Sequence, residues 1–92
     1  MIIRSQNKTK ILNFENLRTI KIEDLEFAEK GKKIIRGYGS ASFANLGEYS
    51  TEEKAIKVLD MIQIAYEEAN SVCNMSGFVA NTVFQMPKDE EA

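Results

Sequence analysis

The element that decides the fold is encoded by residues 50–70, which read STEEKAIKVLDMIQIAYEEAN. Most of these residues favour the helical conformation. The stretch opens with the pattern of a capping box, in which the hydroxyl of Ser50 accepts a hydrogen bond from the backbone and the carboxylate of Glu53 reaches back to the amide of Ser50. We therefore expect a helix from Thr51 to Asn70, with Ser50 as its N-cap residue.

Apolar side chains recur along this helix and define the face that packs on the rest of the protein. At about 100° per residue they form one continuous stripe. The members of the stripe are Ala55, Val58, Leu59, Ile62, Ala65, Tyr66 and Ala69. Ile56 and Met61 widen it on opposite edges, and Ile64 falls among charged residues on the other face. An apolar surface this wide favours a second contact, so we expect a homo-oligomer formed through the 51–70 helix.

The residues before the helix alternate in polarity as strands do. In Leu17–Glu23, Ile20 and Ile22 share one side and Thr19 and Lys21 the other, which is the period of a half-buried strand. Further strands are expected at Ile2–Arg4, at Ile11–Phe14, at Lys33–Tyr38 with an extension to Phe43 at most, and at Phe78–Met86. A hairpin turn is expected at 29–32, because Gly31 is free to adopt positive φ.

The order of these elements predicts an α+β fold. We expect an antiparallel β-sheet, built as a meander, that is packed by the one long α-helix, with a short C-terminal strand at an edge. A chain of 92 residues forms one domain, which we place at residues 1–87. Residues 88–92, KDEEA, are expected to be a disordered acidic tail because they offer little apolar surface to bury.

Charge and composition exclude several classes of protein. The chain carries 12 Lys and Arg against 14 Asp and Glu, so the basic face that a dedicated nucleic-acid binder needs is not expected. It contains no histidine, which is the commonest general base and metal ligand. Its one cysteine, Cys73, therefore lacks the usual activating partner. We expect neither enzymatic activity nor a cofactor or metal.

The sequence also indicates a cellular location. A single cysteine cannot form a disulfide within the chain, which fits a reducing cytoplasm. No apolar run is long enough to cross a membrane, and the first ten residues lack the apolar core of a signal peptide. We expect a cytoplasmic protein without membrane contact.

Residues 36–42, RGYGSAS, place two glycines one residue apart. A dinucleotide-binding fingerprint needs a third glycine and a helix that follows it. Here Ser42 stands at the third position and no helical pattern follows, so we interpret the stretch as a strand. One face of this strand holds Gly37 and Gly39, and the other holds Arg36, Tyr38, Ser40 and Ser42. Glycines within a strand mark the close approach of a helix, another chain or a ligand, and the sequence leaves these three open.

Two polar elements are candidates for ligand binding. The guanidinium, phenol and hydroxyls that follow Arg36 could bind a phosphate or a small polar ligand, and a plain solvated sheet face is the alternative. In the segment 77–82, Phe78 could stack on a base and Asn81 could pair with its edge, unless Phe78 is a core residue and Asn81 a turn residue. The predicted ligand-binding residues are Arg36, Tyr38, Phe78 and Asn81.

Three segments carry a resemblance to known proteins. Residues 1–8 (MIIRSQNK), 46–67 (LGEYSTEEKAIKVLDMIQIAYE) and 83–87 (VFQMP) resemble small, mostly uncharacterised proteins of phages and prophages of Gram-positive bacteria. Small phage α+β proteins include anti-defence proteins such as the first family of Thoeris inhibitors. Those are symmetric oligomers that sequester cyclic nucleotide or cyclic ADP-ribose signals without cleaving them.

The resemblance implies a non-enzymatic, phage-encoded anti-defence protein that binds and sequesters a small cyclic nucleotide in the host cytoplasm. In that function Arg36 would pair with phosphate, Tyr38 or Phe78 would stack on a base, and Asn81 would read the edge of the base. Two alternatives stay open. One is a protein–protein inhibitor of a host defence enzyme, similar to an anti-CRISPR protein, and the other is a structural accessory phage protein.

Overall fold

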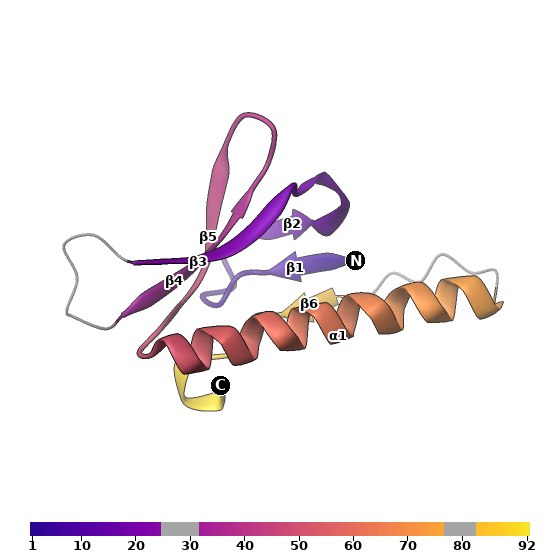
Figure 1. Cartoon of the computed structure of the whole chain (residues 1–92). Coiled ribbons are helices and arrows are strands. Elements are labelled where there is room, and N and C mark those ends of the chain that lie inside the picture. The colour runs from indigo at the N-terminus through magenta and orange to yellow at the C-terminus, as the bar shows by residue number, and fades with distance from the viewer. Residues whose placement is uncertain (25–31, 77–82) are drawn as a thin grey trace.

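The computed structural model describes residues 1–24, 32–76 and 83–92, and the side chains of these residues except those of 70–76. Along the chain the elements are β1 (Ile2–Arg4), β2 (Ile11–Asn13), the 3-10 turn η1 (Phe14–Asn16), β3 (Thr19–Asp24), β4 (Lys33–Tyr38), β5 (Phe43–Tyr49), α1 (Glu52–Ser76), β6 (Val83–Gln85) and the 3-10 turn η2 (Asp89–Glu91) (Figure 1). Most of the predicted turn at 29–32 and the first part of the predicted closing strand fall outside these residues.

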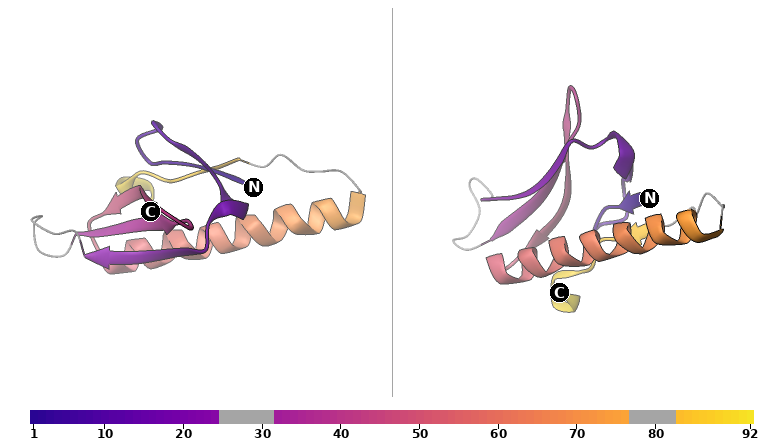
Figure 2. Two further views of the ribbon diagram at one scale, coloured as in Figure 1. Left: turned by 90° about the horizontal axis from the view of Figure 1, so that it is seen from above. Right: turned by 45° about the vertical axis from the view of Figure 1, so that its right-hand side comes forward.

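The predicted α+β class is confirmed, and the strands form two small sheets instead of one. The first is the antiparallel meander β3-β4-β5. The second has the order β2-β1-β6, with β1 antiparallel to β2 and parallel to β6. β6 lies at an edge, as expected for the closing strand. In Figures 1 and 2, α1 runs along one side of both sheets.

The strand β5 was not predicted. The preceding strand was predicted to end at Phe43 at the latest, whereas in the structure the chain turns at residues 39–42 and Phe43–Tyr49 pairs with β4. The register shifts between Ile35, which lies opposite Gly47, and Arg36, which lies opposite Asn45. The extra residue in this bulge, Leu46, breaks the alternation of period two on which strand prediction depends.

The helix begins one residue later than the predicted cap implies. The hydroxyl of Thr51 accepts a hydrogen bond of 3.1 Å from the amide of Lys54, so Thr51 is the N-cap residue and the assignment to Ser50 was wrong. The amide of Ser50 donates instead to the carboxylate of Asp89, at 2.8 Å. At its other end α1 continues past Asn70 to Ser76.

The apolar stripe of α1 faces the core, as predicted, and this core is shared by two sheets, where one was predicted. Ala55, Val58 and Ile62 are buried, whereas Ile56, Met61 and Ile64 are exposed. The buried core cluster comprises Ile3, Ile35, Leu46, Tyr49, Ala55, Val58, Ile62 and Met86. The core therefore joins the helix to strands from both ends of the chain.

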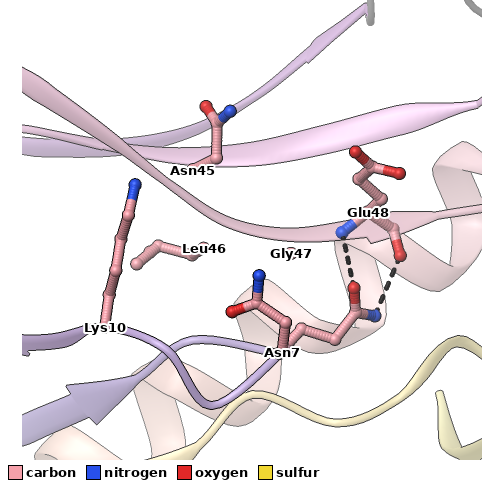
Figure 3. A pocket seen from close by; sticks show the side chains of 7 residues that line it. Asn7, Lys10, Asn45, Leu46, Gly47 and Glu48 are labelled. Atoms are coloured by element: carbon pink, nitrogen blue, oxygen red, sulfur yellow. Dashed lines mark hydrogen bonds between the residues drawn. The ribbon is translucent and has the colours of Figure 1, made fainter.

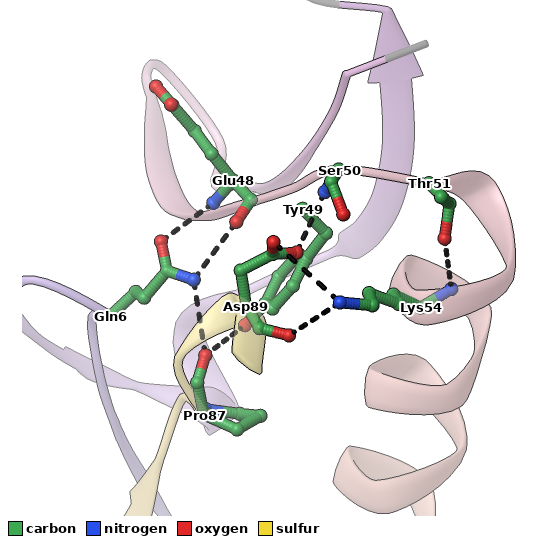
Figure 4. A network of polar contacts seen from close by, with 8 residues as sticks. All are labelled: Gln6, Glu48, Tyr49, Ser50, Thr51, Lys54, Pro87 and Asp89. Atoms are coloured by element: carbon green, nitrogen blue, oxygen red, sulfur yellow. Dashed lines mark hydrogen bonds and ion pairs between the residues drawn. The ribbon is translucent and has the colours of Figure 1, made fainter. Parts of the chain in front are cut away.

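The C-terminal residues are not a disordered tail. The carboxylate of Asp89 accepts from the amide of Ser50 and lies 3.7 Å from the ammonium of Lys54, which also donates to the carbonyl of Asp89 at 3.1 Å (Figure 4). Ala92 packs against the core. The prediction failed because it counted only apolar surface, while this acidic segment is held by polar partners beside the start of α1.

Tyr49 connects these parts. Its side chain is buried, and its phenol donates a 2.7 Å hydrogen bond to the carbonyl of Pro87, directly after the buried Met86. Burial raises the pKa of this phenol above its ordinary value. Gly47 makes room for the ring, because a Cβ at that position would lie 3.0 Å from the hydroxyl and 3.1 Å from the ring of Tyr49.

We predict that Gly47→Ala lowers the free energy of unfolding by about 1–3 kcal/mol, because the added methyl group overpacks a ring that its hydrogen bond holds in place. Urea denaturation measures the change. Gly39→Ala is the matched control, because a Cβ there would meet its nearest atoms at an ordinary 3.6 Å. Equal stability of the two variants would contradict the packing assigned to Gly47.

Candidate functional site

The candidate site lies on the outer face of the β3-β4-β5 sheet, the face opposite to the one that carries Ile35 and Leu46 into the core. The strand register brings side chains from all three strands together on this face. We define the outer face by Lys21, Glu23, Arg36, Tyr38, Phe43 and Asn45.

Three donors converge on the carboxylate of Glu23. The guanidinium of Arg36 donates to Oε2 at 2.8 Å, and the phenol of Tyr38 donates to Oε1. The ammonium of Lys21 lies 3.4 Å from Oε1. Two positive charges and one hydroxyl thus surround a single anionic group.

The same side chains contact the aromatic part of the outer face. The Nε of Arg36 donates to the side-chain oxygen of Asn45 at 2.8 Å, and its guanidinium carbon lies 5.0 Å from the centroid of the Phe43 ring. The ammonium of Lys21 lies 4.9 Å from the centroid of the Tyr38 ring. The rings of Tyr38 and Phe43 are 5.8 Å apart. These distances fit cation–π and aromatic contacts.

The electrostatics of the site follow from these bonds. The hydrogen bond from Tyr38 is the largest cause that holds the pKa of Glu23 below its ordinary value, and desolvation opposes it. Lys21 and Arg36 lower the pKa of Glu23 further. Glu23 is therefore the anion that occupies the donor cluster in the free chain.

The two glycines of residues 36–42 have different roles. A Cβ on Gly37 would lie 3.2 Å from Leu17 and 3.6 Å from Leu46, so Gly37 faces side chains of the same chain. The amide of Gly39 donates to the carbonyl of Ser42 at 2.8 Å, which closes a turn. The prediction that Ser40 and Ser42 continue the strand face of Arg36 was wrong, because this turn ends the strand at Tyr38.

Two of the pockets beside β5 lie near the outer face. The hairpin pocket, of about 480 Å³, is lined by Leu17, Gly37 of β4, residues 39–42 of the turn, the start of β5, and Ile11–Asn13 of β2. The amide pocket, of about 350 Å³, is lined by Gln6, Asn7, Lys10, Asn45, Leu46, Gly47 and Glu48 (Figure 3). Asn45 therefore belongs both to the outer face and to the rim of the amide pocket.

The structure brings together two of the four predicted ligand-binding residues. Arg36 and Tyr38 both contact Glu23, whereas Phe78 and Asn81 lie outside the described residues, and their roles stay predictions. Sequence reasoning missed Glu23, Phe43 and Asn45. Glu23 shares the two-residue period of Thr19 and Lys21, and only its pairing with β4 shows that it lies diagonally opposite Arg36.

Three further observations concern what the chain can bind and what it resembles. Within 1–24, 32–69 and 83–92, no three His, Cys, Asp or Glu side chains gather in a way that could hold a metal ion. In the same part of the chain, no helix is long and apolar enough to cross a membrane. No protein-family model, curated protein sequence or solved structure matches the chain.

We predict that Tyr38→Phe raises the pKa of Glu23 toward its ordinary value of 4.5, because the strongest bond to the carboxylate is lost. A ¹³C NMR titration of the carboxyl group measures the pKa. Since the pKa of Glu23 is lowered in the folded state, its contribution to stability is present above pH 4.5 and is lost as the pH falls through the folded-state value.

Tyr66→Phe is the control for this titration, because the Tyr66 ring packs on Phe14, 4.5 Å between centroids, and not on the outer face. An unchanged pKa of Glu23 in Tyr38→Phe would show that the phenol does not bond the carboxylate in solution.

Proposed function

We propose that the chain is a non-enzymatic, phage-encoded anti-defence protein that binds and sequesters a small cyclic nucleotide in the host cytoplasm. The observation that carries the proposal is the convergence of Lys21, Arg36 and Tyr38 on one carboxylate beside an exposed aromatic ring. In the proposed complex a phosphate of the ligand takes the place that Glu23 occupies in the free chain.

The donor cluster suits a phosphate for chemical reasons. Arg36 offers a planar fork of N–H donors, Lys21 adds a second positive charge, and the hydroxyl of Tyr38 donates a third bond. The three donors already converge on one oxyanion, so their own side chains need little rearrangement to hold a phosphate, and the cost of binding lies in displacing Glu23.

The aromatic part suits a base. Phe43 has 57% of its surface exposed and lies against the guanidinium of Arg36. A base stacked on this ring would place its phosphate toward Arg36, and Asn45 offers an amide to the edge of the base. Phe43 thus takes the stacking role that the sequence assigned to Tyr38 or Phe78.

Native mass spectrometry and calorimetry with cyclic di-AMP, cyclic di-GMP and cyclic ADP-ribose isomers test the proposal. We expect one of these ligands to bind and to be released unaltered on denaturation. Arg36→Ala is expected to weaken its binding about tenfold or more, because a charge-assisted bond is lost. Lys57→Ala, on the exposed side of α1, is the control and should leave the affinity unchanged.

Glu23→Gln is expected to change the affinity for the ligand in the opposite direction. Removing a negative charge about 4 Å from the phosphate is worth about 1 kcal/mol in water, so this variant should bind about fivefold more tightly. Glu48→Gln, an exposed residue of β5, is the matched control. If Glu23→Gln and Arg36→Ala both leave the affinity of a bound ligand unchanged, the ligand does not use the outer face. If no ligand of the panel binds, the proposed function is wrong.

We further propose that the chain forms a homo-oligomer through the 51–70 helix. Ile56 and Ile64 are exposed by 47% and 54%, and their apolar surface gains by contact with a second copy. Ile64→Lys is therefore expected to convert the oligomer into a monomer, as measured by light scattering after gel filtration.

Gln63→Lys is the control for the oligomer. It adds the same charge at a neighbouring exposed position whose side chain bonds Glu67 on the same helix. A wild-type chain that is already monomeric, or an oligomer that survives Ile64→Lys, would refute contact through this face.

A further inference from the structure

The strand β5 is the last strand of its sheet, and within residues 1–24, 32–76 and 83–92 nothing pairs with part of its outer edge. Bonded and non-bonded residue pairs alternate along an antiparallel ladder. Because Gly39 and Ser42 form a bonded pair, the next bonded pair is Gly37 with Ala44. Phe43 and Asn45 therefore direct their backbone N–H and C=O groups away from β4, toward the free edge.

Gln6 closes the other half of this edge. Its amide donates to the carbonyl of Leu46 at 2.7 Å. Its side-chain nitrogen donates to the carbonyl of Glu48 at 2.9 Å, and its side-chain oxygen accepts from the amide of Glu48 at 3.0 Å (Figure 4). The side chain thus imitates a peptide group of a neighbouring strand. The hydrogen bonds of Gln6 extend along β5 from Glu48 to Leu46 only. The backbone groups of Phe43 and Asn45 have no partner among the residues that the structure describes.

A second strand edge, that of β2, also lacks a partner in the described part of the chain, and it borders the same space. Ser5 bonds Lys10, and Phe14 bonds Met1, so the alternation along β1 and β2 turns the backbone groups of Ile11 and Asn13 away from β1. The hairpin pocket is lined by Ile11–Asn13 on one wall and by Phe43 and Ala44 on the other. We call the part of the hairpin pocket that lies between these two strand edges the edge gap.

Two large apolar side chains are exposed at the edge gap. Ile11 is 67% exposed and Phe43 is 57% exposed, one on each wall. Leu12, Leu17 and Gly37 also line the gap. A segment that filled the gap would cover both exposed side chains at once.

We propose that the edge gap binds an extended segment of a partner protein, which adds a strand to β5 at Phe43 and Asn45. Backbone donors and acceptors on alternate residues are the feature that an added strand recognises. The gap has a strand edge on each side, so it suits a single extended segment rather than the edge of a second folded sheet. Such a segment carries apolar side chains on the side that meets Leu17 and Gly37. This interaction goes beyond nucleotide binding, because its ligand is a polypeptide backbone.

Amide hydrogen exchange followed by NMR tests this inference. The probe is an acetylated and amidated peptide of alternating threonine and valine, and its negative control is the same peptide with alternate backbone nitrogens methylated. We expect the first peptide to slow exchange at Phe43 and Asn45 at least tenfold. The methylated peptide should have no effect, and Ala44 should stay protected throughout by its bond to β4.

A pair of variants at Asn45 distinguishes the contribution of its backbone N–H to peptide binding from that of its side chain. Asn45→Pro removes an N–H that points out of the sheet, which an edge strand tolerates, and should abolish the effect of the peptide on Phe43. Asn45→Ala loses the same side chain but keeps the N–H, and should retain the effect. Circular dichroism verifies the fold of both variants, and if Asn45→Pro does not fold, the methylated peptide decides.

Three results would overturn the inference. The first is exchange at Phe43 and Asn45 that millimolar peptide does not change. The second is equal slowing by both peptides. The third is protection of these amides in the protein alone, which would place another part of the chain, or at high concentration a second copy, on the edge.

Discussion

The buried hydrogen bond from Tyr49 to the carbonyl of Pro87 is the constraint on which the arrangement of the molecule depends. A buried phenol without a partner is costly, so β5 must hold its ring where the chain leaves β6. The ring needs a glycine at position 47, and Gln6 donates to the same carbonyl of Pro87 at 3.2 Å. One carbonyl thus fixes the N-terminal loop, the meander and the C-terminal segment relative to the start of α1.

The parts of the fold that could be predicted are those set by neighbouring residues. The stripe of α1 depends on spacing within one helix, and Thr19–Asp24 shows its two faces in its own alternation. The predictions that failed concern features that depend on contacts between residues distant in sequence. In the sequence, Leu46 interrupts the alternation of a strand, and only the pairing of β5 with β4 shows that it is the extra residue of a bulge. From the sequence, Asp89 is expected to be a solvated acid, whereas in the structure its carboxylate accepts a hydrogen bond from the amide of Ser50.

The same distinction applies to the candidate site. Arg36 and Tyr38 could be selected because they alternate within one strand, but the group that organises them could not. Glu23 lies on another strand, and its relation to Arg36 is set by the register of the whole β3-β4 ladder. In the free chain Glu23 therefore offsets one of the two positive charges of the site, which the basic residues alone do not indicate. In the proposed complex the ligand must compete with Glu23, and because each phosphate of a cyclic nucleotide carries a single negative charge, like the carboxylate, stacking on Phe43 has to add to the charge interaction.

The parallel pairing of β1 with β6 has a consequence for how the chain folds. Ile3 lies opposite Phe84, and nearly the whole sequence separates them. The meander and α1 can form from nearby residues, but the β2-β1-β6 sheet cannot be completed until the segment after the helix returns. Closing so long a loop costs conformational entropy before the contacts that stabilise the sheet can form, and this slows folding. During synthesis β1 thus leaves the ribosome long before β6, and until β6 has formed, β1 presents an open edge to other chains.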